Sequence, residues 1–181
     1  IVSTPSGNNV TADDLYFEYV YQNTTIGADR SSWQWYINDV KVNGTLGEYT
    51  STSFDTAASG NGVPLGIAYA NGFFWATDST DAEVYKYTSN GTYTSTSFDT
   101  AASGNGAPYG IAYANGFFWV ADNTDSEIYK YTSNGTYTGS SFDTAASGNT
   151  APYGIAYANG FFWVSNNGID EVYKYYAENI Q

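Results

Sequence analysis

Aspartate pairs recur along the chain at positions where they could bind a metal ion. Asp78 and Asp81 lie in one polar loop, and Asp122 and Asp125 lie in the equivalent loop 44 residues later. Carboxylate oxygens are the ligands that Ca²⁺ prefers, but such aspartates also stabilise turns by accepting backbone N–H groups. The third equivalent loop has Asn166 at the first aspartate position, which breaks the ligand set. We therefore expect no metal or other cofactor, and these four aspartates are the calcium candidates.

The residue types most used in catalysis are scarce. The sequence has no histidine and no cysteine, which excludes the usual general base, the usual catalytic triad, disulfides and thiolate metal sites. Asp55, Asp99 and Asp143 recur in a Ser-Phe-Asp-Thr phrase, and paired carboxylates can perform acid–base hydrolysis. Because an active site breaks the symmetry of repeats, we interpret these aspartates as loop caps. We predict no catalytic residues and no enzymatic activity.

Tryptophans recur as well, and they have two interpretations. Trp75, Trp119 and Trp163 follow pairs of phenylalanines, in a chain with 19 tyrosines. Exposed aromatic rings could stack on sugars, as in a lectin, whereas aromatic side chains on strands more often form a hydrophobic core. We favour the core interpretation, and glycans stay a possible partner.

Five asparagines lie in Asn-x-Ser/Thr sequons, all of them in expected loops or turns: Asn9, Asn23, Asn43, Asn90 and Asn134. Such sequons accept N-linked glycans in secreted proteins. Asn90 and Asn134 also begin Asn-Gly turns, which is an alternative reason for their presence. If the source organism performs N-glycosylation, we expect several of the five to carry a glycan.

The charge balance narrows the choice of partners and compartment. A net charge of −13 repels phosphate backbones and anionic lipid headgroups, and no apolar stretch is long enough to cross a bilayer. We therefore expect neither nucleic-acid binding nor membrane insertion. The chain begins with Ile1 and contains no methionine, so we expect a processed product of an extracellular, cell-surface or virion-surface protein.

A 44-residue repeat organises most of the chain. The phrase Phe-Asp-Thr-Ala-Ala-Ser-Gly-Asn begins at Phe54, Phe98 and Phe142. Within one unit, Asn115-Gly116 separates residues 111–114 from residues 117–120, which is the signal of a two-residue type I′ hairpin. Further strands are expected over residues 127–132 and 136–142. The apolar run at 117–120 indicates a four-stranded antiparallel sheet that is buried on both faces.

Residues 47–175 resemble three copies of the NHL-type β-propeller repeat. The resemblance rests on Ala-Pro-Tyr-Gly-Ile-Ala-Tyr-Ala-Asn-Gly-Phe-Phe-Trp-Val-Ala-Asp over residues 107–122, followed by Glu-Ile-Tyr-Lys-Tyr. It implies a propeller blade, although such propellers include both enzymes and binding scaffolds. Glu83, Glu127 and Glu171 depart from the family pattern, in which a basic residue commonly precedes the third strand.

The number of blades leads to a prediction about assembly. The repeat region opens with an outer-strand phrase at 49–54 and ends after the first three strands of a unit. Three blades cannot close a ring, because propellers have roughly four to eight. We therefore predict that other copies complete the blades, in a closed ring or an open polymer. A slice of a longer array is the rival explanation.

The segment before the repeats is expected to form a separate domain, over residues 1–46, with the repeats at 47–181. Strands are expected at 15–21, 32–37 and 40–42. Residues 10–46 resemble the first half of an immunoglobulin-like domain of a surface protein, which implies an incomplete β-sandwich. A complete sandwich has about seven strands, so we predict that this segment docks on the propeller or on a neighbouring subunit.

The sequence as a whole predicts an all-β chain of four-stranded propeller-type blades preceded by the sandwich-like segment. The predicted function is a non-enzymatic, self-assembling structural protein, such as the subunit of a filament, fibre or ring. The alternative is a multivalent lectin-like module that binds glycans or proteins.

Overall fold

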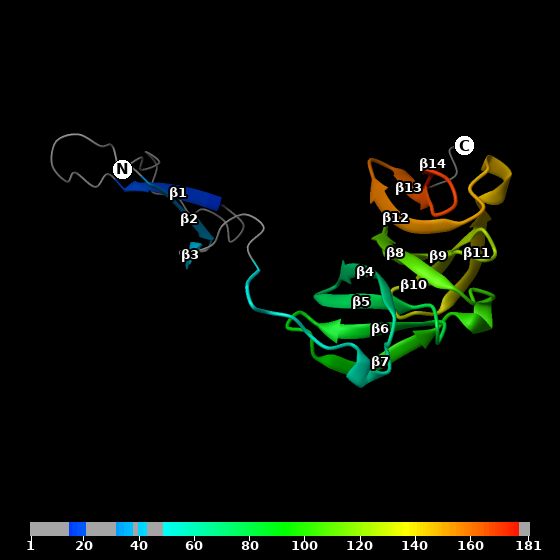
Figure 1. Ribbon diagram of the computed structural model, residues 1–181, viewed down its shortest axis with the longest axis horizontal. Coiled ribbons are helices and arrows are strands. Elements are labelled where there is room, and N and C mark those ends of the chain that lie inside the picture. Colours follow the sequence, from blue (N-terminus) through cyan, green and yellow to red (C-terminus); the bar gives the residue numbers. More distant parts are fainter. Residues whose placement is uncertain (1–14, 21–31, 38–39, 43–48, 178–181) are drawn as a thin grey trace. The chain divides into compact units, whose positions relative to one another are not determined.

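The computed structural model describes residues 15–20, 32–37, 40–42 and 49–177, and the chain divides into two compact units, Ile1–Thr52 and Ser53–Gln181. The first unit contains β1 (Leu15–Val20), β2 (Ser32–Ile37) and β3 (Val40–Val42), which pair antiparallel in that order. The strands expected in this segment are therefore confirmed (Figure 1). Its likeness to an immunoglobulin-like domain and its docking stay predictions.

The second unit contains one antiparallel sheet per repeat, and the strands of each sheet pair in chain order. The first sheet comprises β4 (Pro64–Ala70), β5 (Phe73–Asp78), β6 (Glu83–Thr88) and β7 (Tyr93–Asp99). The second comprises β8 (Pro108–Ala114), β9 (Phe117–Asp122), β10 (Glu127–Thr132) and β11 (Tyr137–Asp143). The third comprises β12 (Pro152–Ala158), β13 (Phe161–Asn166) and β14 (Val172–Tyr176). The predicted all-β, blade-type fold is confirmed.

Two kinds of turn separate the strands. Asn71 and Gly72 both have positive φ, 52° and 84°, which is the type I′ hairpin expected for an Asn-Gly pair. The turn between β6 and β7 is different, because only Gly91 of Asn90-Gly91 has positive φ, at 86°. Its amide donates to the Thr88 carbonyl, and the strand register shifts between Lys86 and Tyr87. The second Asn-Gly of the first two units thus makes a longer, bulged turn.

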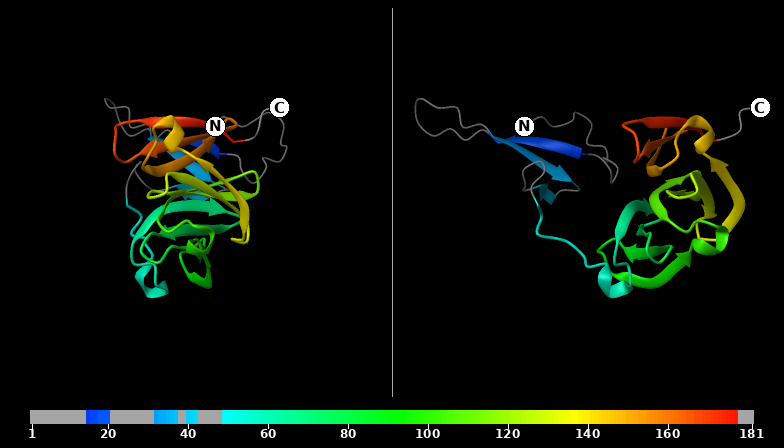
Figure 2. Two further views of the ribbon diagram at one scale, coloured as in Figure 1. Left: turned by 90° about the vertical axis from the view of Figure 1, so that its right-hand side faces the viewer. Right: turned by 45° about the vertical axis from the view of Figure 1, so that its right-hand side comes forward.

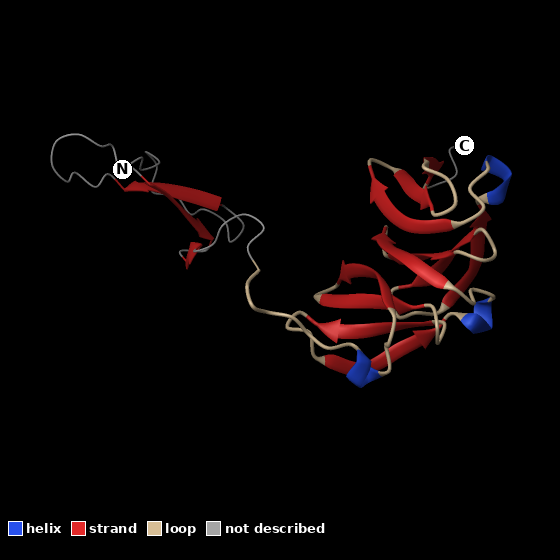
Figure 3. Cartoon of the chain, in the orientation of Figure 1, coloured by secondary structure: helices blue, strands red, loops and turns tan. Residues whose placement is uncertain are grey.

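A short 3₁₀ helix follows each outer-strand phrase: η1 (Ala57–Ser59), η2 (Ala101–Ser103) and η3 (Ala145–Ser147). These are the three helices drawn in Figure 3. The carboxylate of Asp99 accepts the Ala101 N–H at 2.7 Å, and Asp55 and Asp143 make the equivalent bonds at 2.9 and 2.6 Å. The interpretation of these aspartates as loop caps is therefore confirmed.

The three sheets stack face to face in sequence order and do not close into a ring (Figures 1 and 2). An aromatic core fills each gap between sheets. The Trp75 ring lies 4.7 Å from Phe118 of the second sheet, and Trp119 lies 4.7 Å from Phe162 of the third, as measured between ring centroids. Phe118 is fully buried. The two gaps are therefore copies of one interface.

Backbone contacts hold the innermost strands of neighbouring sheets close together. A Cβ atom added to Gly66 would lie 2.3 Å from the Tyr109 carbonyl oxygen, and one added to Gly110 would lie 2.4 Å from the Tyr153 oxygen. The Thr77 hydroxyl reinforces the first contact by donating to the Tyr109 oxygen at 2.6 Å. These glycines set the spacing between blades, because any side chain there would push two backbones apart.

Candidate functional site

The loop aspartates stabilise the ends of hairpins. Asp78 is buried, and its carboxylate accepts N–H groups of Val63 at 3.1 Å, Thr80 at 2.7 Å and Asp81 at 3.3 Å. The carboxylate of Asp122 does the same with Ala107, Thr124 and Asp125. In the third sheet the Asn166 side-chain oxygen accepts N–H groups of Gly168 and Ile169. The position therefore caps the loop in every repeat, even where the residue carries no charge.

The electrostatics of Asp78 fit this structural role. Burial by itself raises the pKa of the carboxyl group, but N–H groups of Val63, Thr80, Asp81 and Gly62 outweigh burial and hold the pKa below its ordinary value of 3.8. Asp81 is exposed and accepts a hydrogen bond from the Tyr85 hydroxyl at 3.2 Å. Within the described residues, no three carboxylates gather as a group that could hold a metal ion. Calcium binding stays untested.

Replacing Asp78 by alanine is expected to lower the unfolding free energy by about 1–3 kcal/mol, because buried N–H groups lose their acceptor. The Asp81→Ala variant is the matched control, since its carboxylate is exposed, and its effect is expected to stay within about 0.5 kcal/mol. Urea unfolding measures both. Equal losses for the two variants would show that the loop does not depend on the buried cap.

The three tryptophans differ sharply in exposure, although they occupy the same repeat position. Trp75 is buried between the first two sheets, Trp119 is half-buried between the second and third, and Trp163 is 40% exposed. Lys130 lies over the Phe117 ring at 4.0 Å and beside Trp119 at 5.1 Å, and Lys86 repeats the arrangement in the first sheet. The core interpretation therefore holds for Trp75 and Trp119, whereas Trp163 lies on an open sheet face.

That open face is the outer side of the third sheet, which we call the last face; its exposed residues are Trp163, Val172 and Tyr176. Val172 is 63% exposed, yet its counterparts Val84 and Ile128 are fully buried against the next sheet. Burying one such side chain contributes roughly 1.5–3 kcal/mol. The last face thus has the residues of an inter-sheet contact, with no further sheet of the second unit against it.

The opposite side of the stack is also open, and we call it the first face; its exposed residues are Leu65, Ile67 and Tyr69. Ile67 is 59% exposed, while its counterpart Ile111 is buried against the first sheet. Tyr69 is exposed where Tyr113 packs on the inter-sheet core. The first and last faces are therefore the two halves of the interface that occurs twice inside the chain.

Two buried tyrosines, Tyr131 and Tyr85, have shifted acidity. Burial raises the pKa of Tyr131 to about 12, although bonds to Ser103 and Asn105 act in the opposite direction. The Tyr131 and Ser103 hydroxyls are 2.6 Å apart. Burial, followed by the charge of Glu83, also raises the pKa of Tyr85 above its ordinary value of 10.0. Ionisation of these phenols is therefore coupled to unfolding.

Stability is expected to fall as the pH rises above 10, the ordinary pKa of tyrosine. The unfolded chain ionises Tyr131 from that pH, whereas the folded chain holds the proton up to about pH 12. Urea unfolding at a series of pH values measures the effect, with phenolate absorbance reporting ionisation. The Tyr131→Phe variant should lose less stability over this range. Equal losses in the two proteins would show that Tyr131 is not the group responsible.

Among the pockets formed by the described residues, two lie along the sheets. One, of about 190 Å³, follows the innermost strands, and three equivalent tripeptides line it: Leu-Gly-Ile at residues 65–67 and Tyr-Gly-Ile at residues 109–111 and 153–155. This lining contains no carboxylate, amine or guanidinium, so it offers no charged catalytic pair. The other, of about 620 Å³, lies between the second and third sheets; its lining is Trp119, Lys130, Ser140, Ser141, Phe142, Asp143, Tyr175, Tyr176 and Ala177.

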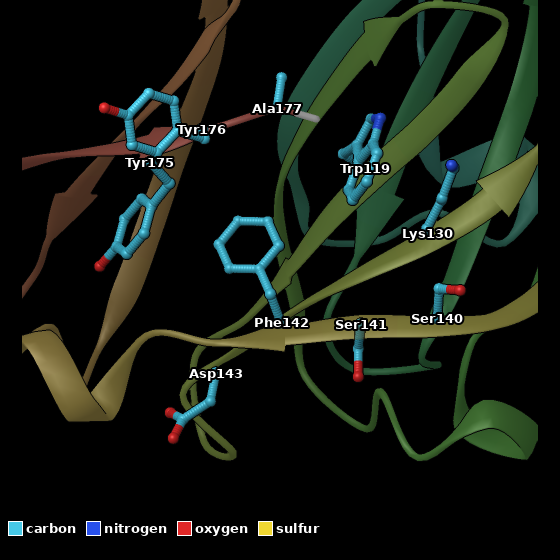
Figure 4. Close-up of a pocket in the computed structure, with 9 residues that line it drawn as sticks. All are labelled: Trp119, Lys130, Ser140, Ser141, Phe142, Asp143, Tyr175, Tyr176 and Ala177. Atoms are coloured by element: carbon cyan, nitrogen blue, oxygen red, sulfur yellow. The ribbon is translucent and has the colours of Figure 1, made fainter. Parts of the chain in front are cut away.

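The larger pocket combines four aromatic residues with polar side chains. Figure 4 shows the Phe142 ring between Tyr175 on one side and Trp119 and Lys130 on the other, while Asp143 points away from them. The Phe142 ring centroid lies 5.2 Å from that of Tyr175 and 6.1 Å from that of Trp119. Asp143 is engaged in capping η3. The pocket can therefore accept an aromatic side chain, but it presents no acid–base machinery.

Of the five sequon asparagines, Asn90 and Asn134 are exposed in the bulged turns. Their side-chain oxygens accept hydrogen bonds from Thr92 and Thr136 hydroxyls, both at 3.2 Å. Asn9, Asn23 and Asn43 lie outside the described residues. Glycosylation of all five stays a prediction.

Among the described residues, no helix has the length and apolar character needed to span a membrane.

Comparisons with known proteins bear on the fold alone. No protein-family model matches the sequence, and no curated protein matches it. A luciferin-regenerating enzyme is similar in structure, with a TM-score of 0.50, 18% identity, and coverage of 59% of this chain and 38% of that one. Virginiamycin B lyase from Staphylococcus aureus has a TM-score of 0.48 and 19% identity, covering 65% of this chain and 42% of that one. BamB from Moraxella catarrhalis has a TM-score of 0.43 and 11% identity, covering 55% of this chain and 28% of that one.

These similar structures are β-propeller-like repeat proteins. The chain spans only about two fifths of the length of the first two. At such identities the likeness shows the type of fold and no activity. The narrower NHL-type assignment stays a prediction. The chain is thus an all-β protein of propeller-type blades, and within the second unit the two terminal sheets have no neighbouring blade on their outer faces.

Proposed function

We propose that this chain is a non-enzymatic structural module that assembles head to tail, with the last face of one copy packed on the first face of another. The observation that supports this most strongly is that residues at two repeat positions are exposed at the ends of the stack and buried inside it. Val172 and Ile67 are exposed at the ends of the stack, while Val84 and Ile111 are buried inside it. A second copy can bury the exposed pair by repeating a contact that the chain already makes twice.

The number of blades favours a particular assembly. Propellers close with roughly four to eight blades, so two chains with three blades each would form a ring of six. Each chain would contribute one first face and one last face, and a two-fold axis would relate the two contacts. If the rotation between successive copies does not close a ring, the same head-to-tail contact would instead build an open filament.

The lack of histidine and cysteine and the acidic composition are consistent with a structural role. The sequence contains no histidine or cysteine, and the recurrent aspartates cap loops. A net charge of −13 keeps a repetitive β protein soluble and limits unspecific association of its edges. Together with the sequons, these features support an extracellular or cell-surface module. NHL-type blades, glycan-bearing loops and the linking role of the N-terminal segment belong to the same proposal.

Variants blocked at one face test the head-to-tail arrangement. Ile67→Asp places a charge on the first face, and Trp163→Asp places one on the last face. Because each variant keeps one intact face, either alone should remain a monomer, whereas an equimolar mixture should form heterodimers joined by a single contact. Analytical ultracentrifugation of the two variants and their mixture measures this. Heterodimers would support the proposal; a mixture that stays monomeric while the unmodified chain associates would refute it.

A further inference from the structure

The segment Tyr49–Asp55 repeats the sequence of an outer strand without forming one among the described residues. It has the same sequence, Tyr-Thr-Ser-Thr-Ser-Phe-Asp, as the outer strand β7, but it is not part of any sheet. Its backbone already has the bulge of that strand, because Ser51 has a φ of 60° and Ser95 of β7 has 59°. The segment therefore has both the sequence and a key conformation of a fourth strand.

The third sheet has the matching open edge. Its strand order ends at β14, whereas β6 and β10 in the same position each pair with an outer strand. Unpaired edges present N–H and C=O groups that favour the addition of another strand. The described chain thus contains three strands of this sheet. The sequence of a fourth strand occurs at residues 49–55, which precede the first sheet in the chain.

The pocket between the second and third sheets lies where the repeat would place a tyrosine ring of a fourth strand. In the second sheet, Tyr137 of β11 packs on the preceding inter-sheet core, with its ring 5.7 Å from Tyr131. Tyr175 is the repeat counterpart of Tyr131 and lines the pocket of about 620 Å³. Tyr49 is the repeat counterpart of Tyr137, and its side chain is 68% exposed. An added fourth strand would place this ring in the pocket shown in Figure 4.

Phe54 determines which sheet the segment can complete. In the first gap, Phe98 at the end of β7 contacts Trp75 of its own sheet at 5.9 Å and Tyr131 of the next sheet at 5.2 Å. Phe54 already has the second of these contacts, with Tyr87 at 5.2 Å, and it packs against Gly91. Its missing contact is a tryptophan on a preceding sheet. Trp163 on the last face of another copy has the required position.

Resting on the proposed head-to-tail assembly, we propose that Tyr49–Asp55 of one chain is the fourth strand of the third sheet of a second copy. The strand pairs antiparallel with β14 and inserts Tyr49 between the second and third sheets of that copy. In β6 and β7, Val84 is opposite Phe98, Lys86 opposite Thr96, and Tyr87 opposite Tyr93. The same register places Phe54 opposite Val172, Thr52 opposite Lys174, and Tyr49 opposite Tyr175.

Cysteine pairs test the register directly, since the chain has no cysteine of its own. The full-length Thr52→Cys and Lys174→Cys variants are mixed and oxidised, and a covalent dimer is expected. The matched control replaces Thr52→Cys by Ser53→Cys, which points to the opposite face of the strand and should form at least tenfold less dimer. A double variant with Cys at 52 and 174 is oxidised at low concentration to detect a disulfide within one chain.

The outcomes separate the strand from the assembly as a whole. A covalent dimer that forms between Thr52→Cys and Lys174→Cys, but not between Ser53→Cys and Lys174→Cys, supports donation of the strand from one copy to another. If the unmodified chain forms oligomers but the cysteine at 52 is no more reactive than the one at 53, strand donation is overturned. The head-to-tail contact between faces is then still supported. A monomeric unmodified chain overturns both, and a disulfide within single chains shows that the strand returns to its own third sheet.

Tyr49 provides a second measurement that does not rely on cysteines. Tyr49→Ala removes the ring that fills the pocket and should weaken association at least about tenfold, as expected for a buried tyrosine at an interface. Tyr49→Phe keeps the ring and should restore association to within about threefold. If alanine and phenylalanine had equal dissociation constants, the pocket would not be the place of this side chain.

Discussion

Replacing Phe118 by alanine is expected to lower the unfolding free energy of the repeat unit by about 3–5 kcal/mol. The ring is fully buried, and its centroid lies 4.7 Å from Trp75, 4.9 Å from Tyr113 and 6.1 Å from Phe98. Its removal leaves a cavity between two sheets, because the three remaining rings belong to different strands. Urea unfolding, followed by tryptophan fluorescence, measures the loss.

The neighbouring Phe117 is the matched control for this prediction. It has the same side chain on the same strand, but it is only half-buried, beneath Lys130. The Phe117→Ala variant is therefore expected to lose clearly less stability than Phe118→Ala. Similar losses for the two variants would mean that the gap between the sheets is not the main core of the unit.

Replacing Gly110 by alanine is the second large effect that we expect. The added Cβ would lie 2.4 Å from the Tyr153 oxygen and 2.9 Å from the Ile155 nitrogen, so two backbones must separate. Such overpacking destabilises a protein by about 1–3 kcal/mol or more. Thermal unfolding should report a lower midpoint for this variant.

Gly154 occupies the same repeat position on the third sheet and gives the informative comparison. An added Cβ there would meet only the Ser165 hydroxyl, at 3.1 Å. Gly154→Ala should therefore leave the stability of a single chain within about 0.5 kcal/mol. Its association should nevertheless weaken at least about tenfold, because in the assembly this Cβ would meet the Leu65 backbone of a second copy. Unchanged association of Gly154→Ala would argue against the repeated contact.

Local chemistry made much of the fold predictable from the sequence. Asn71-Gly72 predicted a type I′ turn because both residues accept positive φ, and the apolar run at 117–120 predicted a sheet buried on both faces. The sequence did not reveal the bulge at Ser95, since a serine with positive φ, here 59°, is uncommon. The 3₁₀ helices were likewise not predicted, because three-residue helices have no periodicity to detect.

Residues at the proposed assembly site were harder to identify than the repeat itself. From the sequence alone, Trp75, Trp119 and Trp163 are equivalent, because they occupy one position in three copies of the repeat. Exposure distinguishes them, and exposure depends on whether a neighbouring sheet is present. Tyr49 was also not identified as an assembly residue, although Tyr49 and Tyr137 are visibly the same residue of the repeat. Comparing each terminal repeat with its buried counterparts would have identified both.

The mass of the native particle, measured by light scattering on the unmodified chain over a range of concentrations, tests the central claim of head-to-tail assembly most directly. The account predicts a particle of two chains if a ring of six blades closes, or larger integer multiples if it stays open. A mass equal to one chain at every concentration would contradict it, because the first and last faces would then remain exposed to water.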